Sequence, residues 1–410
     1  MRRPASAPAC LTLLVLTCAT VQAENWTRFR GPNGTGISDA KTIPAHITPD
    51  HFNWKVELPG EGYGSPTVWG DRVFVTGADP SNAERMLACL DADTGKTLWV
   101  RQWASKPYHV HPKYGHFGTT TPAVDADHVY NYFVTDTSVT LMALTHKGEE
   151  VWKHDLGPFD SAHGGGTSPM LYKDLVIITH DQRANPDSPG KPAIFAFNRK
   201  TGEQVWKLDR NRADNGTSYG VPCIYTGPDG KDQLIVGSKG NGVTGIDPMT
   251  GKVLWSLGDV FSLRVVASPI VAGDLVFSQM GSGGTGKRFV GVKPGVGNVK
   301  PQLAVDLKRS IPYVPTPLYY KGHLYFIHDG GDFGCLDPKT GDAIWMEEGP
   351  KNTEFFGSPV CVNGVIYAMS RDGKLVSFKA SPDGLGDVHV TDLGEKTYAT
   401  PAVANGRMFL

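Results

Sequence analysis

Short apolar runs separated by turn residues recur along the chain from residue 65 onward. Each unit begins near a proline, usually as Ser-Pro or Thr-Pro, and continues with two apolar runs around a Gly-Asp, Asn-Gly or Lys-Gly centre. This pattern predicts a β-hairpin. The units are SPTVWGDRVFVTG (65–77), TPAVDADHVYNYF (121–133), SPMLYKDLVIITH (168–180), VPCIYTGPDGKDQLIVG (221–237), SPIVAGDLVFSQ (268–279), TPLYYKGHLYFIH (316–328) and SPVCVNGVIYAMS (358–370).

A second hairpin follows most of these openings. Its turn reads LDADTGKTLW (90–99), and it returns as FNRKTGEQVW (197–206), IDPMTGKVLW (246–255), LDPKTGDAIW (336–345) and, shortened, LTHKGEEVW (144–152). The first acidic or amide side chain accepts backbone amides across the turn, and the Thr-Gly pair accommodates positive φ. Two hairpins make a four-stranded antiparallel sheet of about 45 residues.

A sheet of this size cannot bury both of its faces, so it must stack on its neighbours, and a closed ring of such sheets protects their edges. Two fragments, FNWKVELPG (52–60) and TPAVANGRMFL (400–410), add one more unit to the seven. The sequence therefore predicts an all-β, eight-bladed β-propeller of four-stranded antiparallel blades over residues 52–410. We expect Phe52–Leu58 to close the ring by pairing beside the C-terminal strands. The sequence stops at Leu410 in the middle of this last blade, so either the sequence is a fragment, with the blade truncated, or the blade is thin.

Tryptophan ends most of the second hairpins. An indole offers a large apolar surface and one N–H donor, which suits it to lie across the neighbouring blade. We expect this docking role for Trp54, Trp99, Trp152, Trp206, Trp255 and Trp345. The fifth and seventh units lack the residue.

The N-terminal residues 1–23 read as a secretory signal peptide, with Arg2 and Arg3 before an apolar run and Val21-Gln22-Ala23 at its end. Residues 24–51 then form an N-terminal leader segment. We expect an exported protein, periplasmic or secreted. Lipid anchoring at Cys18 is disfavoured because Val15-Leu16-Thr17 matches a lipoprotein signal poorly.

Charge and cysteine content bear on the partners that the protein can bind and on whether it contains disulfides. Forty basic and 41 acidic residues without a basic cluster speak against nucleic acid as a partner. No apolar stretch after residue 23 is long enough to span a bilayer. Cys89, Cys223, Cys335 and Cys361 are expected to be small core residues rather than a disulfide framework, because Cys89 and Cys335 occupy equivalent places in two repeats.

The repeat resembles the pyrroloquinoline-quinone (PQQ)-like, or quinoprotein-like, propeller family. That family's hallmark is an Ala-x-Asp-x-x-Thr-Gly-Lys-x-x-Trp docking turn, and residues 94–99 and 250–255 match its second half. The resemblance covers nearly all of residues 52–410. It implies either a quinoprotein dehydrogenase or a cofactor-free propeller, such as the eight-bladed outer-membrane-protein assembly factors. The leader Asn25-Trp26-x-x-Phe29-Arg30-Gly31-Pro32-Asn33-Gly34 looks like that of exported bacterial proteins of this repeat class.

Resemblance to the dehydrogenases implies PQQ with Ca²⁺, held by a Glu/Asn/Asp set beside a catalytic Asp. The chain has no adjacent cysteine pair and no Cys-x-x-Cys-His haem motif. Its many Asp and Asn residues sit mostly in predicted turns, where they have a structural explanation. We therefore assign no catalytic residue and expect no cofactor, while PQQ with Ca²⁺ stays the alternative.

Histidines cluster in the sequence YHVHPKYGH (108–116). In an extended segment His109 and His111 project to one side, and a turn could return His116 to them, which gives a candidate metal site. The alternative is a solvated or structural loop.

The segments that enter successive blades carry a ring or a cation near the opening proline. Propellers place such segments around one mouth of the central channel, so these side chains could form an axial rim that binds a ligand. They could equally pack against neighbouring blades. The predicted rim consists of Tyr63, His116, His163, Tyr219, Arg264, Tyr313, Phe356 and Tyr398.

The sequence thus favours an exported, non-catalytic propeller that acts as a binding scaffold at the cell envelope. Its expected partners are proteins or a small ligand at the channel mouth. The alternative is a PQQ- and Ca²⁺-dependent oxidoreductase acting on alcohols or sugars. Glycan binding through the aromatic rim is a third hypothesis.

Overall fold

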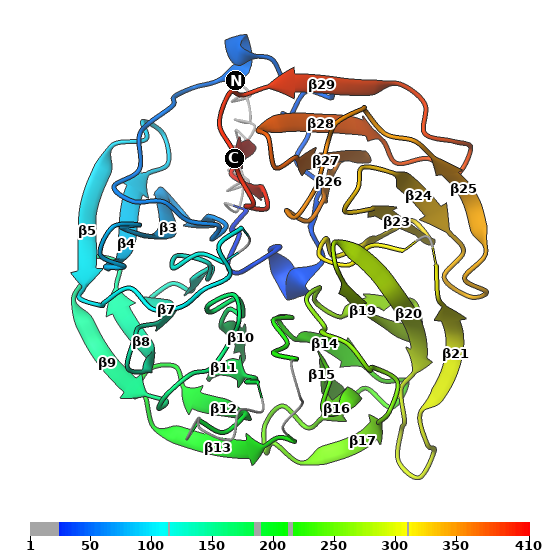
Figure 1. The fold of residues 1–410 in the computed structure, drawn as a ribbon, viewed down its shortest axis with the longest axis horizontal. Helices are drawn as coiled ribbons and strands as arrows, with labels where there is room; N and C mark the ends of the chain where they lie inside the picture. Colours follow the sequence, from blue (N-terminus) through cyan, green and yellow to red (C-terminus); the bar gives the residue numbers. More distant parts are fainter. Residues whose placement is uncertain (1–23, 114, 184–189, 212–215, 310) are drawn as a thin grey trace, which may run out of the picture.

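The strands of the protein form a ring of antiparallel sheets around a central axis (Figure 1). The computed structural model describes residues 24–410 except 114, 184–189, 212–215 and 310, so the predicted signal peptide lies outside the described residues. Within these residues seven sheets have four blade strands each, in chain order from the axis outward, and an eighth sheet has two. The predicted all-β propeller is confirmed.

Blades 1 to 4 cover the first half of the ring. Blade 1 contains β2 (Thr67–Trp69), β3 (Arg72–Ala78), β4 (Arg85–Asp91) and β5 (Thr97–Trp103). Blade 2 contains β6 (Ala123–Val124), β7 (His128–Val134), β8 (Val139–Thr145) and β9 (Glu150–Asp155). Blade 3 contains β10 (Met170–Tyr172), β11 (Leu175–His180), β12 (Ala193–Asn198) and β13 (Gln204–Asp209). Blade 4 contains β14 (Cys223–Thr226), β15 (Asp232–Ser238), β16 (Gly242–Ile246) and β17 (Val253–Leu257).

Blades 5 to 8 complete the ring. Blade 5 contains β18 (Ile270–Ala272), β19 (Leu275–Ser282), β20 (Thr285–Lys293) and β21 (Gln302–Leu307). Blade 6 contains β22 (Leu318–Tyr320), β23 (His323–Ile327), β24 (Phe333–Leu336) and β25 (Ala343–Glu347). Blade 7 contains β26 (Val360–Val362), β27 (Val365–Met369), β28 (Lys374–Lys379) and β29 (Val388–Asp392). Blade 8 contains only β30 (Ala402–Ala404) and β31 (Arg407–Phe409).

The hydrophobic core lies between neighbouring blades. Tyr130 and Leu141 of blade 2, for example, pack in one cluster with Ile178 and Phe195 of blade 3. Each sheet therefore buries its faces against the next one, as the size of the repeat requires. Cys89, Cys223, Cys335 and Cys361 are buried free thiols in this core.

The serine or threonine before each opening proline links its blade to the next. In most blades this residue's backbone N–H donates to the hydroxyl of its counterpart in the following blade at 2.9–3.0 Å. The link from Thr400 to Ser65 crosses the ring seam at 2.9 Å. Val221 has no hydroxyl, so the belt is open between Ser168 and Val221. The belt consists of Ser65, Thr121, Ser168, Val221, Ser268, Thr316, Ser358 and Thr400.

The tryptophans lie against the turn of the following blade. The indole N–H groups of Trp99, Trp152 and Trp206 donate to backbone carbonyls of blades 2, 3 and 4 at 2.9–3.0 Å. Trp345 donates likewise to Ser381 of blade 7, at 2.9 Å. Trp255 differs, because blade 5 lacks the Thr-Gly turn. Its N–H donates to Gln233 of its own blade at 2.6 Å, and the Gln233 amide donates to Gly295 of blade 5 at 3.0 Å.

The seam between blades 8 and 1 closes differently from the prediction. No strand is assigned to Phe52–Leu58 and no pairing with β31 is recorded there, so the expected strand closure is not observed in the described part of the chain. Trp54 instead docks as the other tryptophans do, donating to Ala92 of blade 1 at 3.1 Å.

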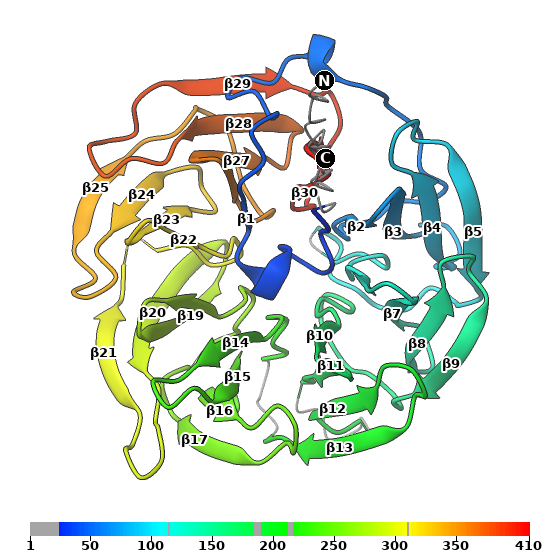
Figure 2. The same ribbon diagram turned by 180° about the vertical axis from the view of Figure 1, so that it is seen from behind.

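The leader runs across the axis of the ring (Figures 1 and 2). Its single-turn helix η1 (Pro32–Gly34) lies at the centre of the ring in both views (Figures 1 and 2). A second such turn, η2 (Pro49–His51), lies at the outside of the ring near blade 7. Strand β1 (Ile37–Ser38) between them adds to blade 7 as a fifth strand, parallel to β26. Sequence reasoning had left this leader without a structural role.

Two arginines anchor the leader inside the ring. Arg28 donates to the carbonyl of Pro222 in blade 4 at 2.7 Å. Arg30 donates to those of Thr316 and Pro317 in blade 6, at 2.8 and 2.9 Å. Both side chains are buried without a carboxylate partner among the described residues, and burial lowers the pKa of Arg30 to about 9. The leader therefore links blades 4 and 6, which are not adjacent in the ring.

No helix among the described residues has the length and apolar character needed to cross a bilayer.

Candidate functional site at the channel mouth

Half of the predicted rim forms one continuous row of rings in tilted contact. The Tyr63 ring lies 4.7 Å from that of His116 and 4.0 Å from that of Tyr398, centroid to centroid, and Tyr398 lies 5.4 Å from Phe356. These residues enter blades 1, 2, 8 and 7, and all four keep part of their surface exposed. We call Phe356, Tyr398, Tyr63 and His116 the aromatic arc.

Arg371, which sequence reasoning missed, supports the arc from blade 7. Its guanidinium lies 4.8 Å from the Phe356 ring centroid and 5.3 Å from that of Tyr398. It also donates to the Tyr398 hydroxyl at 3.1 Å and pairs with Glu354. Burial, followed by the neighbouring Tyr398, raises the pKa of Tyr63 to about 12, so its hydroxyl stays protonated at neutral pH. The arc is therefore neutral and amphipathic.

The other half of the rim is organised by Arg264. Its side chain reaches from blade 5 to blade 3 and donates from Nη1 to His163 Nε2 at 2.5 Å. Arginine is a donor only, so His163 Nε2 must accept and the ring is neutral. Burial, with Arg264 and then His111 nearby, lowers the pKa of His163 to about 4, in agreement with this state. No ion pair of Arg264 with a carboxylate is found among the described residues.

Two predicted rim residues are almost fully buried and pack inside the protein. Tyr219 is 8% exposed and Tyr313 is 6% exposed. The Tyr219 hydroxyl lies 2.6 Å from Ser161 Oγ, and its ring lies 6.5 Å from that of His163. Tyr219 and Tyr313 pack, while the other six residues leave surface at the mouth.

The three predicted metal ligands are not assembled. His111 stacks on His163 with ring centroids 5.1 Å apart, whereas the ring of His116 is tilted against that of Tyr63 and accepts the Gly118 N–H at its Nδ1. His109 is exposed. Across the described residues no three His, Cys, Asp or Glu side chains converge as metal ligands do. The loop instead contributes rings to the rim.

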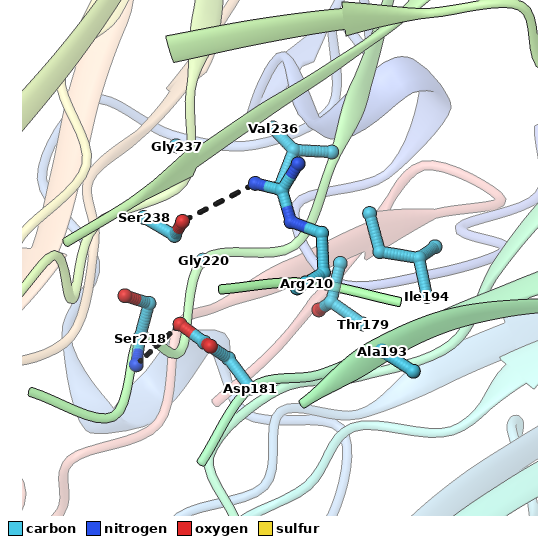
Figure 3. A pocket seen from close by; sticks show the side chains of 10 residues that line it. All are labelled: Thr179, Asp181, Ala193, Ile194, Arg210, Ser218, Gly220, Val236, Gly237 and Ser238. Carbon is cyan, nitrogen blue, oxygen red and sulfur yellow. Dashed lines mark hydrogen bonds between the residues drawn. The ribbon is translucent and has the colours of Figure 1, made fainter. Parts of the chain in front are cut away.

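A small polar cavity lies beside the rim, between blades 3 and 4 (Figure 3). Its volume of about 10 Å³ is room for a single water. Asp181 accepts the Ser218 N–H at 3.1 Å, and Arg210 donates to Ser238 at 3.2 Å. Burial raises the pKa of Asp181 to about 6 and lowers that of Arg210 to about 10. The cavity is too small for an organic ligand.

A Ca²⁺ ion beside a quinone would need oxygen ligands from the acidic groups of the mouth. Ca²⁺ takes six to eight oxygen ligands. The carboxylate of Asp329 is already held by the N–H groups of Tyr313 and Val314, at 2.6 and 3.1 Å, and that of Asp181 by Ser218. These two carboxylates alone do not make a calcium site beside a quinone, and we derive no reaction step from one.

Comparison with known proteins agrees with this architecture. The family model for the outer membrane protein assembly factor BamB matches residues 50–131, 83–286 and 196–410, which together cover the ring. The chain belongs to this family. A curated relative, BamB of Yersinia pestis, is 21% identical over 86% of the chain and 74% of its own length.

The same propeller also occurs in enzymes. A polyvinylalcohol dehydrogenase of a Pseudomonas species is 24% identical over 80% of the chain. The chain spans only 42% of that enzyme's length. The solved structure of a europium-containing methanol dehydrogenase superposes with a TM-score of 0.61, at 13% identity, over 92% of this chain and 87% of that one. This likeness concerns the fold.

Proposed function

We propose that the protein is an exported, non-catalytic binding propeller of the cell envelope, and that a segment of a partner protein binds across the aromatic arc. The observation that carries the proposal is the continuous, partly exposed row of rings in the aromatic arc, contributed by four consecutive blades: Phe356, Tyr398, Tyr63 and His116. Rigid aromatic side chains bury large areas at little entropic cost and are enriched at the centres of protein interfaces. Membership of a family named for assembly factors supports a protein partner.

The mouth offers specificity as well as surface. Beside the neutral arc, Arg264 presents a cation that contacts the neutral His163 and Tyr313. A carboxylate of the partner would find this guanidinium at the mouth, and charge-assisted hydrogen bonds of this kind add both strength and orientation. A segment with apolar residues followed by an acidic one fits the two halves of the rim.

The test compares partner recovery from the native envelope by three forms of the protein. We expect the parent to retain its partners and a His116→Ala/His163→Ala variant to lose them. Tyr172→Ala is the matched control, since Tyr172 is a partly exposed tyrosine at the hairpin end of β10, away from the entry segments. A double variant that keeps every partner of the parent would refute the rim as the binding surface.

Oxidoreductase activity with PQQ and Ca²⁺ is the second candidate, because one relative is named a dehydrogenase. It is tested by incubating the purified protein with the quinone and Ca²⁺ and measuring dye reduction with alcohols and sugars. Tight quinone uptake with turnover would replace the scaffold proposal. A thermal shift with oligosaccharides would support glycan binding instead.

A further inference from the structure

Blade 7 contains a pocket of about 450 Å³, a volume typical of sites for small molecules. It lies between β27, β28 and β29, the loop 380–387 that joins β28 to β29, and the leader at Ala45. Successive connections of an antiparallel sheet alternate between its two ends. The loop is therefore at the opposite end of blade 7 from the turn 370–373, which holds Arg371 of the channel mouth. The pocket is a separate site from the aromatic arc.

The leader forms one wall of the pocket and is fixed to blade 7. Figure 2 shows it passing in front of this blade between η2 and β1. The Ser377 hydroxyl donates to the Ala45 carbonyl at 2.5 Å. The next leader residue, His46, stacks on His389 of β29 with ring centroids 4.7 Å apart and an angle of 6° between the rings. These contacts hold His389, which lines the pocket, beside the leader.

The loop 380–387 forms another wall and is fixed to blade 6. Its Ser381 carbonyl accepts the indole N–H of Trp345 at 2.9 Å. The N–H of Leu385 donates to the Glu347 carboxylate at 3.2 Å, and the Leu385 side chain packs in the core cluster between blades 6 and 7. Both walls are thus held by hydrogen bonds and packing to neighbouring elements, so the pocket is formed before a ligand binds.

The pocket combines apolar surface with two separate charges. Val365 and Leu385 supply apolar surface. Lys379 follows Ser377 by two residues and pairs with Val365, so these side chains share the face of blade 7 that the leader covers. Asp387 lines the same pocket from the loop. Both charged side chains are exposed, and neither forms an ion pair with any residue that the structure describes.

We propose that this pocket binds a small zwitterion with an apolar body, which is an apolar amino acid or a short apolar peptide. Val365 and Leu385 contact the apolar body, Lys379 binds the carboxylate, and Asp387 binds the ammonium group. A ligand with only one kind of charge would meet one of the two charged residues as a like charge, so complementary charges select the zwitterion. The site lies away from the channel mouth, and its occupation does not depend on the proposed binding at the aromatic arc.

Calorimetric titration of the purified protein tests the site. The probes are L-phenylalanine and L-leucyl-L-phenylalanine, which distinguish a free amino acid from a peptide as the ligand. Each probe is compared with its C-terminal amide, which lacks the carboxylate, and with its N-acetyl derivative, which lacks the ammonium group. We expect saturable binding of at least one zwitterion and about fivefold weaker binding of each of its derivatives. No binding of either zwitterion, or equal affinity for a zwitterion and its derivatives, would overturn the proposal.

Two variants test the contact assigned to each charge. Lys379→Met should weaken binding of the zwitterion about fivefold without weakening that of its amide. Asp387→Asn should weaken binding of the zwitterion by about the same factor without weakening that of the N-acetyl derivative. Lys339→Met, on an exposed turn of blade 6 outside the pocket, is the matched control and should bind as the parent does. An equal loss for all ligands in both pocket variants would refute these contacts.

Filling the pocket gives a test that does not depend on charge. Ala45 is exposed and lines the pocket, so Ala45→Trp places a large side chain there without inserting it into the core. We expect this variant to bind the zwitterion about tenfold more weakly, or less, while it keeps the urea unfolding midpoint of the parent. His116→Ala/His163→Ala should bind the zwitterion as the parent does, which separates this site from the channel mouth. Parent-like affinity in Ala45→Trp would place the ligand elsewhere and overturn the proposal.

Discussion

The indole of Trp206 lies flat on Gly251, the glycine of the next blade's Thr-Gly turn. A Cβ atom on Gly251 would stand 2.7 Å from the indole ring, and the glycine φ is +73°. The same arrangement joins Trp54 to Gly95 and Trp152 to Gly202. The repeated turn thus needs glycine for two reasons, its left-handed backbone and the flat surface that it offers to the indole.

Gly251→Ala should therefore destabilise the protein by about 2–4 kcal/mol, because it adds a buried collision to the cost of positive φ. Gly230→Ala is the matched control. Gly230 has φ +74° and no atom within 4 Å of its would-be Cβ, so only the backbone cost of about 1 kcal/mol applies. Urea unfolding of both variants measures the difference. Equal losses would show that docking against glycine contributes nothing.

The belt of hydroxyl bonds predicts a weak point at the seam. Ser65→Ala removes the acceptor of the buried Thr400 N–H, the belt bond that closes the ring. An unsatisfied buried donor costs about 1–3 kcal/mol. We expect a loss of this size in urea unfolding, together with faster amide exchange in β30 and β31. Exchange that speeds up equally in all blades would contradict a seam-specific role.

Completing the belt should stabilise the ring. Val221→Thr is nearly isosteric and places a hydroxyl where its counterparts in the other blades accept the N–H of the preceding one. A gain of about 0.5–1.5 kcal/mol is expected if the hydroxyl accepts the Ser168 N–H. The midpoint of thermal unfolding measures it, and Val221→Ala controls for the lost methyl. A Thr variant less stable than the parent would mean that desolvation of the hydroxyl outweighs the bond.

The ring and its repeats follow from the sequence because local signals repeat there. The Thr-Gly turns and the tryptophans of blades 1, 2, 3, 4 and 6 report the same blade geometry, and the entry positions of Tyr63, Tyr398 and Phe356 pointed to a shared surface. The leader could not be placed, because Arg28 and Arg30 contact carbonyls about 190 and 290 residues away. Arg371 was missed for the same reason, since its partners come from other segments of the chain.

His163 should make stability pH-dependent. Its pKa is about 4 in the folded protein, below the ordinary value of 6.5, so the unfolded chain binds more protons between these pH values. Its contribution is complete above pH 6.5 and is lost as the pH falls toward 4. His163→Gln keeps an acceptor for Arg264 and lacks this titration. At pH 4.5 the variant should gain about 1–2 kcal/mol on the parent, relative to the difference at pH 7.5.

Comparing the parent with His163→Gln separates the effect of His163 on stability from the effects of other titrating groups. Burial lowers the pKa of His180 to about 4 and raises that of Asp329 to about 6, but both residues remain in parent and variant, so their effects cancel. Urea unfolding at the two pH values provides the measurement. A difference that does not change with pH would show that His163 is protonated as readily in the folded state as in the unfolded chain.

The hydrogen bonds of Arg30 attach the leader to blade 6. Its guanidinium is fully buried with no carboxylate partner in the described part of the chain, and this burial costs desolvation energy. It nevertheless donates to the carbonyls of Thr316 and Pro317 in blade 6. Hydrogen bonds from a charged donor contribute about 1.5–3 kcal/mol each, and Arg30→Met would leave both carbonyls without this donor.

We therefore expect Arg30→Met to lower the free energy of unfolding by about 2 kcal/mol and to expose residues 24–51 to proteolysis. Asn33→Ala, which removes exposed bonds to Ile224 in blade 4, should cost less than about 1 kcal/mol. A Met variant as stable as the parent would mean that the uncompensated charge costs as much as its hydrogen bonds supply. In that case the apolar contacts of Trp26 and the β1–β26 pairing hold the leader in the ring.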